Sequence, residues 1–228
     1  MKSEYSYDLV DGHIIVDADP NHLLIDTGAP SSVVNTSPLD FAGKRHVVSK
    51  NYMGVTPESL SGSIGTPIDA LVGADILNQY DILIHPSRCH IVLSEEALPA
   101  DGDNLSLDSF MGIPIIDAAV SGKTVRMFFD TGARLSYLRP ELSTQFPAAG
   151  EESDFYPGMG EFTTQTYSVP IRIGTKETTL RVGTLPELLQ ETLMMANTDG
   201  ILGTAVLDAY TILFAPRRKI MCLRERNG

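Results

Sequence analysis

Two short stretches of the chain carry the same acidic turn, LLIDTGAP at residues 23–30 and MFFDTGAR at residues 127–134. In each stretch, three large apolar residues precede Asp-Thr-Gly-Ala, so Asp26 and Asp130 follow runs that look buried. A carboxylate at such a position is costly unless a partner or a reaction uses it. Two carboxylates a few ångströms apart cannot both ionise cheaply, so they share a proton. One can then act as a base on a trapped water while the other polarises a carbonyl, which is a route to amide hydrolysis without a covalent intermediate.

Each turn also has residues suited to hold a carboxylate in place. Thr27 and Thr131 offer hydroxyls that could bond across to the opposite turn. Gly28 and Gly132 allow a tight backbone whose amides can point at the carboxylates. One Asp-Thr-Gly alone would be a weak signal, because an ordinary turn in which the carboxylate bonds its own backbone explains it as well. Two copies at matching positions are a much stronger signal.

The two turns belong to an internal repeat. Residues 71–93 align without a gap on residues 201–223, at an offset of 130, with eight identities in 23 positions. The identical pairs are Gly73/Gly203, Leu77/Leu207, Tyr80/Tyr210, Ile82/Ile212, Leu83/Leu213, Pro86/Pro216, Arg88/Arg218 and Leu93/Leu223. The first pair of glycines would let a strand pass close beneath each turn. The chain therefore reads as a duplication whose equivalent turns would meet at the interface between the halves.

Short runs such as ILIHP, HIVL, TILFAP and KIMCL are rich in β-forming residues and bounded by turn residues, which predicts a mainly β chain. A few short helices are expected between the strands. The longest covers PELLQETLMM, residues 186–195, where Leu188, Leu189 and Met195 have helical spacing and are interpreted as core residues.

These motifs resemble those of aspartic proteases of the pepsin/retroviral-protease group, in a single-chain duplicated form. Residues 201–223 resemble the C-terminal lobe of pepsin-like enzymes, and residues 71–86 resemble the corresponding part of retroviral-type proteases. The resemblance implies a mainly β, two-lobed acid-protease fold with pseudo-twofold symmetry. It also implies that Asp26 and Asp130 form the catalytic pair of an aspartic endopeptidase and share a proton.

The expected domains follow from the duplication and the resemblance. The N-terminal lobe covers residues 1–93, an acidic interlobe linker covers 94–109, and the C-terminal lobe covers 110–228. A peptide or unfolded protein would bind in extended conformation between the lobes. Since one chain supplies both carboxylates, a monomer is expected. No cofactor and no metal are implied.

The resemblance further implies a flap, a hairpin that closes over the substrate. From Asp26 to Gly73 is 47 residues, and from Asp130 to Gly203 is 73, so the second half has 26 more. This extra length includes DFYPGMGEFTTQTYSV at 154–169, which reads as a hairpin. Its expected substrate-binding residues are Tyr156, Gly158, Met159 and Gly160. The corresponding segment of the first half, residues 50–67, is short for a flap.

Two positions depart from the family pattern. Pro30 and Arg134 stand two residues after the glycine, where the family usually has a Ser, Thr or Asp that supports the loop or a carboxylate. Ser31 and Ser136 lie one and two residues further on and are the candidates to supply that support. The alternative function is therefore a catalytically weak or inactive protease-like module that binds peptides. A third interpretation is structural, with both Asp residues merely capping turns.

Composition limits the expected partners and location. The 228 residues have a formal net charge of −12, which argues against nucleic acid and anionic membrane surfaces. No apolar run has the length of a membrane span, and the N-terminus lacks the apolar core of a signal peptide. The protein is expected in the cytoplasm if the chain is full-length, and exported or anchored only if a segment is missing. Cys89 and Cys222 have no metal-binding spacing, and a bridge between them is left open.

One feature runs against the negative charge, a basic cluster near the C-terminus. Its members are Arg217, Arg218, Lys219, Arg224 and Arg226. Because the chain as a whole is acidic, we interpret the cluster as a solvated hairpin turn and tail rather than as a binding patch.

Overall fold

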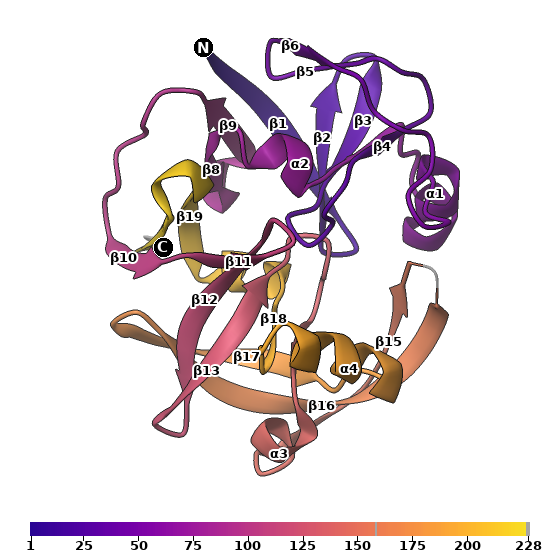
Figure 1. Cartoon of the computed structure of the whole chain (residues 1–228). Helices are drawn as coiled ribbons and strands as arrows, with labels where there is room; N and C mark the ends of the chain where they lie inside the picture. Colours follow the sequence, from indigo (N-terminus) through magenta and orange to yellow (C-terminus); the bar gives the residue numbers. More distant parts are fainter. Residues whose placement is uncertain (158, 227–228) are drawn as a thin grey trace.

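The computed structural model describes residues 1–157 and 159–226, and it is mainly β, with several sheets (Figure 1). The mainly β expectation is confirmed. The strands are β1 Lys2–Val10, β2 His13–Ala18, β3 Asn21–Ile25, β4 Val33–Val34, β5 Leu39–Phe41, β6 Lys44–His46, β7 Ala70–Val72, β8 Asp81–His85, β9 His90–Ser94, β10 Asp103–Ser106, β11 Asp108–Phe110, β12 Ile113–Val120, β13 Lys123–Phe129, β14 Ser136–Leu138, β15 Ala148–Tyr156, β16 Gly160–Ile173, β17 Lys176–Gly183, β18 Gly200–Leu202, β19 Tyr210–Ala215 and β20 Ile220–Glu225. The helices are α1 Pro57–Ile64, α2 Ala74–Leu77, α3 Pro140–Ser143 and α4 Glu187–Met195, with short 3-10 helices η1 Pro86–Arg88, η2 Thr204–Asp208 and η3 Pro216–Arg218.

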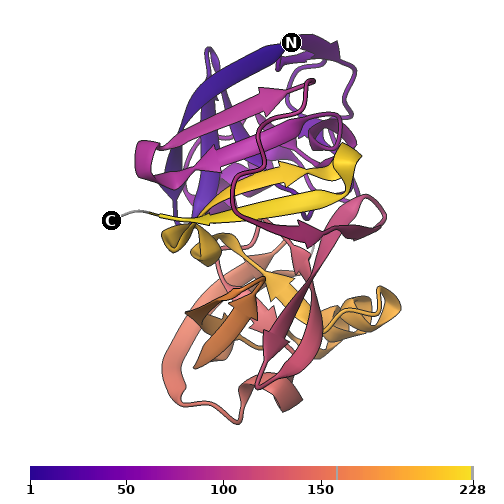
Figure 2. The same ribbon diagram turned by 90° about the vertical axis from the view of Figure 1, so that its left-hand side faces the viewer.

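The largest sheet joins strands from both halves of the chain. Its order is β10-β20-β19-β8-β9-β1-β2-β3-β7-β4, and Figure 2 shows β19 and β20, in yellow, beside strands of the first half. The two halves meet where β8 pairs antiparallel with β19. The paired residues are Ile82 with Phe214, Leu83 with Leu213, and Ile84 with Ile212. At the central pair, a strand therefore lies against its own copy in the repeat.

A second sheet of eight strands belongs to the second half, in the order β11-β12-β13-β18-β14-β17-β16-β15. Strands β5 and β6 form a separate two-stranded ribbon. In Figure 1 the long strand β16 crosses the lower part of the molecule, and α4 lies beside this sheet. The first half has no counterpart of the long antiparallel set β15, β16 and β17 among the described residues.

The two halves begin with equivalent pairings. Strand β1 pairs with β9 through its first residues and with β2 through its last ones. In the second half two short strands divide this task, since β10 pairs with β20 and β11 with β12. The turns that follow, residues 11–12 and 111–112, have positive φ at both positions. The segment 94–109, expected as a linker, thus contains β10 and most of β11, and its irregular residues are 95–102 and 107.

One apolar core extends through both halves. It includes Ile25, Tyr80, Phe129 and Phe214, all of them buried. The rings of Phe129 and Phe214 are tilted against each other with centroids 6.0 Å apart. The strand that leads into each Asp-Thr-Gly turn is therefore anchored in shared core, which restricts where the turns can move.

Helix α4 occupies the predicted place, but only Leu189 of its three expected core residues is buried. Leu189 and Leu193 are buried, whereas Leu188 and Met195 are 65% and 76% exposed. Residues four apart lie on one face of a helix, and the structure buries the 189/193 face. Leu188 and Met195 lie on the neighbouring face, about 100° away around the helix, so the prediction is confirmed for Leu189 and wrong for the other two.

The basic cluster near the C-terminus has a structural task at two of its positions. Asp81 is fully buried, and its carboxylate oxygens lie 3.0 Å from Nη2 of Arg217 and 2.6 Å from Nη2 of Arg218. The Leu98 N–H also donates to this carboxylate, at 3.0 Å. The side chains of these two arginines are 35% and 31% exposed, so they remain partly solvated while they neutralise a buried charge of the first half.

Two further sequence-based points can be compared with the structure. Both cysteines lie in the described part of the chain and both are free, with Cys89 exposed and Cys222 buried, so no bridge joins them. Among residues 1–157 and 159–226, no helix combines the length and the apolar character that crossing a membrane requires.

Candidate functional site

The two Asp-Thr-Gly turns are held by equivalent backbone contacts. Strand β3 pairs parallel with β7, and β13 pairs parallel with β18. Directly after β3, the Asp26 N–H donates to the Val72 carbonyl at 3.0 Å, and after β13 the Asp130 N–H donates to the Leu202 carbonyl at 3.0 Å. Each acidic residue is thus fixed at the C-terminal end of a strand that pairs in parallel with its neighbour.

The two threonines join the turns to each other. The Thr27 N–H donates to Oγ1 of Thr131, and the Thr131 N–H donates to Oγ1 of Thr27, both at 3.0 Å. The Thr27 hydroxyl donates to the Phe129 carbonyl and the Thr131 hydroxyl to the Ile25 carbonyl, both at 2.7 Å. Both threonines are buried. Four reciprocal hydrogen bonds shielded from water therefore fix one turn against the other.

Each glycine of the turns lies against the carboxylate of the opposite turn. A Cβ atom placed on Gly28 would overlap the carboxylate of Asp130, and one placed on Gly132 would overlap the carboxylate of Asp26. Only a residue without a side chain fits at either position. The carboxylates of Asp26 and Asp130, called the carboxylate pair below, therefore face each other across the two glycines.

Backbone amides of each turn bind its own carboxylate. Oδ1 of Asp26 accepts the N–H groups of Gly28 at 2.9 Å and Ala29 at 3.0 Å. Oδ1 of Asp130 accepts the N–H of Gly132 at 2.8 Å. These bonds orient both carboxylates and support their charged forms.

Burial dominates the titration of the carboxylate pair. It raises the pKa of Asp26 well above the ordinary value, and the negative charge of Asp130 raises it further. Burial likewise raises the pKa of Asp130, and the amide hydrogen bond from Gly132 offsets part of that rise. The pair therefore retains a proton at a pH at which an isolated aspartic acid has lost it, and that proton belongs to the pair.

A serine supports each turn from behind. The Gly203 N–H donates to Oγ of Ser136 at 3.1 Å, and the Gly73 N–H donates to Oγ of Ser32 at 2.9 Å. Both serines are buried. Gly73 and Gly203 pass close to the turns, as expected. A Cβ on Gly203 would overlap the Leu135 carbonyl oxygen, and one on Gly73 would lie 2.7 Å from the Ala29 carbonyl oxygen.

The prediction that Ser31 supports the first turn is corrected to Ser32. The carbonyl group of Ser31 lies beside Gly73, where a Cβ would be 3.0 Å from its carbon and 3.2 Å from its oxygen. The hydroxyl that bonds the loop is that of Ser32, which also donates to Oδ1 of Asp75 at 2.6 Å. The signal was present in the sequence, because the offset of 104 that relates the two Asp-Thr-Gly turns relates Ser32 to Ser136.

The two departures from the family pattern have different surroundings. Pro30 has no N–H to donate. Arg134 turns toward acidic residues, with its guanidinium nitrogens 3.4 Å from Asp11, 3.3 Å from Glu152 and 3.6 Å from Asp154. Among the described residues, no side-chain hydroxyl donates to either carboxylate of the pair.

The expected flap segment is a hairpin. Strands β15 and β16 pair antiparallel from Ala148–Tyr167 to Tyr156–Gly160. Met159 lies in the connecting turn and is 36% exposed. Gly158 lies outside the described residues. Tyr156 and Gly160 thus stand at the two sides of the hairpin end.

Tyr156 lies within the electrostatic reach of the carboxylate pair. Burial raises the pKa of Tyr156, and the charges of Asp130 and Asp26 raise it further. The phenol therefore stays protonated, as a hydrogen-bond donor on the same side of the molecule as the pair. Its side chain is nevertheless 40% exposed, so it is accessible to a ligand.

The β15–β16 hairpin also contacts the first half of the chain. Phe155 packs against an apolar cluster that includes Leu60 and Ile64 of α1, and its ring centroid is 5.8 Å from that of His13. Figure 1 shows the end of the hairpin directed toward α1. Helix α1 lies within residues 50–67, the segment judged short for a flap, so the first half has a helix there.

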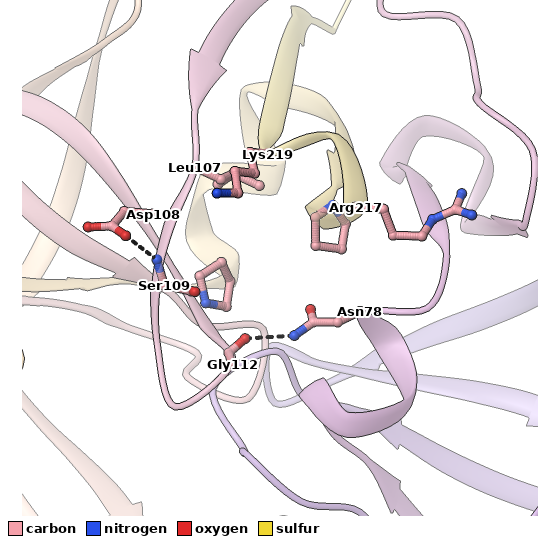
Figure 3. Close-up of a pocket in the computed structure, with 9 residues that line it drawn as sticks. Asn78, Leu107, Asp108, Ser109, Gly112, Arg217 and Lys219 are labelled. Carbon is pink, nitrogen blue, oxygen red and sulfur yellow. Dashed lines mark hydrogen bonds between the residues drawn. The ribbon is translucent and has the colours of Figure 1, made fainter.

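A separate cavity of about 190 Å³ lies near the junction of the halves (Figure 3). Its lining residues are Asn78, Leu107, Asp108, Ser109, Gly112, Pro114, Pro216, Arg217 and Lys219. The Asn78 amide donates to the Gly112 carbonyl at 2.8 Å, and its oxygen is buried without a protein partner. None of the lining residues belongs to the Asp-Thr-Gly turns. The part of the chain that the structure describes contains no cluster of three or more His, Cys, Asp or Glu side chains placed to hold a metal.

A scan against protein-family models and a search of curated proteins both find no match for this chain. Inferences about its activity therefore depend on the geometry of the two turns and the hairpin.

Proposed function

We propose that this chain is an aspartic endopeptidase with the two-lobed, pseudo-twofold fold of the pepsin/retroviral-protease group. One observation carries the proposal. The carboxylates of Asp26 and Asp130 each lie against the glycine of the opposite turn, and reciprocal threonine bonds brace the turns. If the two aspartates only capped their own turns, neither the packing of each glycine against the opposite carboxylate nor the four buried hydrogen bonds between the turns would be needed.

The pair can carry out hydrolysis by moving protons alone. The ionised carboxylate takes a proton from a water held between the two groups, and the water oxygen attacks the carbonyl carbon of the substrate. The protonated carboxyl donates its proton to the carbonyl oxygen, giving a tetrahedral diol. When the C–N bond breaks, the amine takes a proton from the carboxyl group that holds one, and a hydroxyl of the diol gives its proton to a carboxylate of the pair. The products are a carboxylic acid, an amine and the pair in its singly protonated form.

The raised pKa values of the pair suit this cycle. Burial favours retention of one proton, and the amides of Gly28, Ala29 and Gly132 stabilise the one remaining charge. The β15–β16 hairpin would cover an extended peptide, with Tyr156 as a donor above the reacting carbonyl. Because both carboxylates come from one chain, a monomer suffices. Specific activity should therefore stay constant on dilution.

Asn substitutions test the proposal directly. Asp26→Asn and Asp130→Asn should each lower cleavage of an unstructured protein by at least about a thousandfold, because either change removes the base or the shared proton. Cleavage is measured from pH 3 to 8, with thermal melts to show that the variants fold. A pepstatin-type inhibitor should block the wild type. Undiminished cleavage by either variant would exclude the carboxylate pair from the mechanism.

The alternative function, a peptide-binding module with little or no activity, has one observation in its favour. Neither Pro30 nor Arg134 has a hydroxyl that could donate a hydrogen bond to a carboxylate of the pair. The family usually has a Ser, Thr or Asp at this position. This module would bind an extended peptide and a pepstatin-type inhibitor without turnover at any pH. Calorimetric binding of a peptide that is never cleaved would favour it over the enzyme.

A further inference from the structure

We propose that Arg134 is a positioning residue that fastens the β15–β16 hairpin to the turn carrying Asp130. The inference rests on the proposed function in one respect, that the hairpin covers a bound peptide. The attachment itself is independent of catalysis and can be measured without it.

The contacts of the guanidinium connect three separate elements. Its nitrogens lie 3.4 Å from Asp11 in the β1–β2 turn, and 3.3 Å and 3.6 Å from Glu152 and Asp154 in β15. It also donates to the Ser153 carbonyl. The Arg134 side chain is only 20% exposed, so these interactions are partly shielded from water. An arginine with its donors distributed in this way holds neighbouring elements in one geometry.

The stem of the side chain is fixed as well. A Cβ on Gly12 would lie 2.6 Å from Cβ of Arg134, so only glycine lets the stem pass. The Thr204 hydroxyl lies 2.6 Å from the Gly12 carbonyl, to which it donates, and 3.2 Å from the Ala133 carbonyl. The β1–β2 turn, the second Asp-Thr-Gly turn and the start of η2 therefore form one block from which Arg134 reaches the hairpin.

The acidic partners depend on Arg134 for compensation. The side chain of Asp154 is only 7% exposed. Its other carboxylate oxygen accepts a hydrogen bond from the Tyr137 hydroxyl. Glu152 is shared with Arg181, which lies in β17 and does not touch the turn. Without Arg134, the buried Asp154 would lose its positive partner, and the strand could restore hydration only by moving outward.

The distribution of residues between the halves agrees with this role. Pro30 stands at the position equivalent to Arg134, 104 residues earlier, and it can form no ion pair. The first half has α1 where the second half has the hairpin. The arginine is therefore present in the half that has a hairpin to hold.

The test compares Arg134→Met with Arg139→Met. Methionine keeps an unbranched stem against Gly12 but removes the charge and all donors. Arg139 is a matched control, because it also belongs to the second half and pairs with a carboxylate, that of Asp199. It forms no ion pair or hydrogen bond with the described residues of the hairpin. Arg134→Lys retains the charge at a single point and should restore part of the attachment.

The first readout is amide hydrogen exchange of peptides that cover residues 148–157. In Arg134→Met these amides should exchange about tenfold faster than in the wild type, because the local opening of the strand becomes easier. In Arg134→Lys the increase should be smaller, and in Arg139→Met exchange in this segment should equal that of the wild type. Unchanged exchange in Arg134→Met would overturn the inference, whether or not the protein cleaves peptides.

The second readout is the split between KM and kcat. The threonine bonds that brace the carboxylate pair do not involve Arg134, so kcat should change less than about threefold, while KM should rise about tenfold. A loss confined to kcat would mean that Arg134 acts on the carboxylates instead and would also overturn the inference. If the wild type cleaves nothing but Arg134→Met still shows faster exchange, the attachment stands and the proposed function fails.

Discussion

The two Asp-Thr-Gly turns are alike within their own backbone and differ immediately beyond it. Both have the threonine bonds, the glycine against the opposite carboxylate and a serine behind the turn. Two residues after the glycine, Pro30 ends the likeness in the first turn, and Arg134 begins the contact with the hairpin in the second. The contacts that both turns have hold the carboxylate pair. The contacts of Arg134, which the first turn lacks, connect the second turn to the hairpin.

This difference indicates how a duplicated chain can divide its tasks. A shared pair of turns has to remain symmetric, because each half supplies what the other lacks. If the hairpin covers a bound peptide, as proposed, one cover is enough, and a second copy would compete for the same space. The first half accordingly has α1 and the short ribbon β5–β6 where the second has three long strands. The predictions below test where the symmetric part ends.

Among the changes that test this comparison, the largest effect is expected from a methyl group on either glycine of the turns. In Gly28→Ala and Gly132→Ala, the new Cβ overlaps the opposite carboxylate, which must move by about an ångström, and such a displacement lowers turnover by about a hundredfold or more. Both variants should lose cleavage equally. Gly62→Ala is the control, because its Cβ would meet no atom within 4 Å. A variant that retains activity at one glycine only would show that the turns are not equivalent.

The next effect concerns the threonines. Thr27→Val replaces a hydroxyl by a methyl group of nearly equal volume. It leaves the Phe129 carbonyl and the Thr131 N–H without the hydrogen bonds that the hydroxyl formed. Thr131→Val does the same to Ile25 and Thr27. Each variant should lose about 2–4 kcal/mol of unfolding free energy, since two buried groups become unsatisfied. Urea denaturation checks this, and a difference above about 1 kcal/mol between the two variants would break the symmetry.

A smaller effect should depend on pH. The pKa of Asp26 is raised in the folded protein, so above its ordinary value of 3.8 the unfolded chain releases protons that the folded pair retains. Unfolding therefore becomes easier as the pH rises through that window. Asp26→Asn and Asp130→Asn should be more stable than the wild type above this pH, and the gain should vanish below it. Denaturation curves from pH 3 to 8 measure the gain, and a gain independent of pH would contradict it.

The smallest effect separates the two serines. Ser32 bonds both Gly73 and Asp75, whereas Ser136 accepts from Gly203 alone, so the serine contacts extend further in the first half. Ser32→Ala should cost about 2 kcal/mol and Ser136→Ala about 1 kcal/mol. Asp75→Ala in the Ser32→Ala background should add a further cost, since the backbone N–H of residue 32 also donates to Oδ1 of Asp75, at 3.0 Å. Equal costs for the two serines would show that the Asp75 contact is worth nothing.

The symmetric part of the site could be predicted from the sequence because its signals are local. A threonine beside the aspartate and a glycine after it permit few arrangements when two copies of the turn meet. The hairpin at 154–169 was also predictable, since its turn residues stand between two β-rich runs. The error at Ser31 came from counting forward from Pro30 and not from the offset of 104 residues.

Contacts between distant residues could not be predicted from the same signals. Arg217 lies 136 residues from Asp81, and nothing near Arg217 in the sequence indicates that its partner is a buried carboxylate. The ion pairs of Arg134 with Asp11 and Glu152 likewise depend on how β1 and β15 are placed by the sheets. For α4, the predicted core residues combined Leu189 with Leu188 and Met195 of the neighbouring helix face. Only packing against the sheet decides which face is buried.

The pairing of β8 with β19, and of β19 with β20, has a consequence for the order of events during protein synthesis. A ribosome exposes Asp26 early, but the turn of Asp130 rests on β18, and the sheet that joins the halves needs β19 and β20, which end at Glu225. A nascent chain therefore has no assembled carboxylate pair until β20 has been translated. If the protein cleaves peptides, this order protects the growing chain and its neighbours from premature digestion.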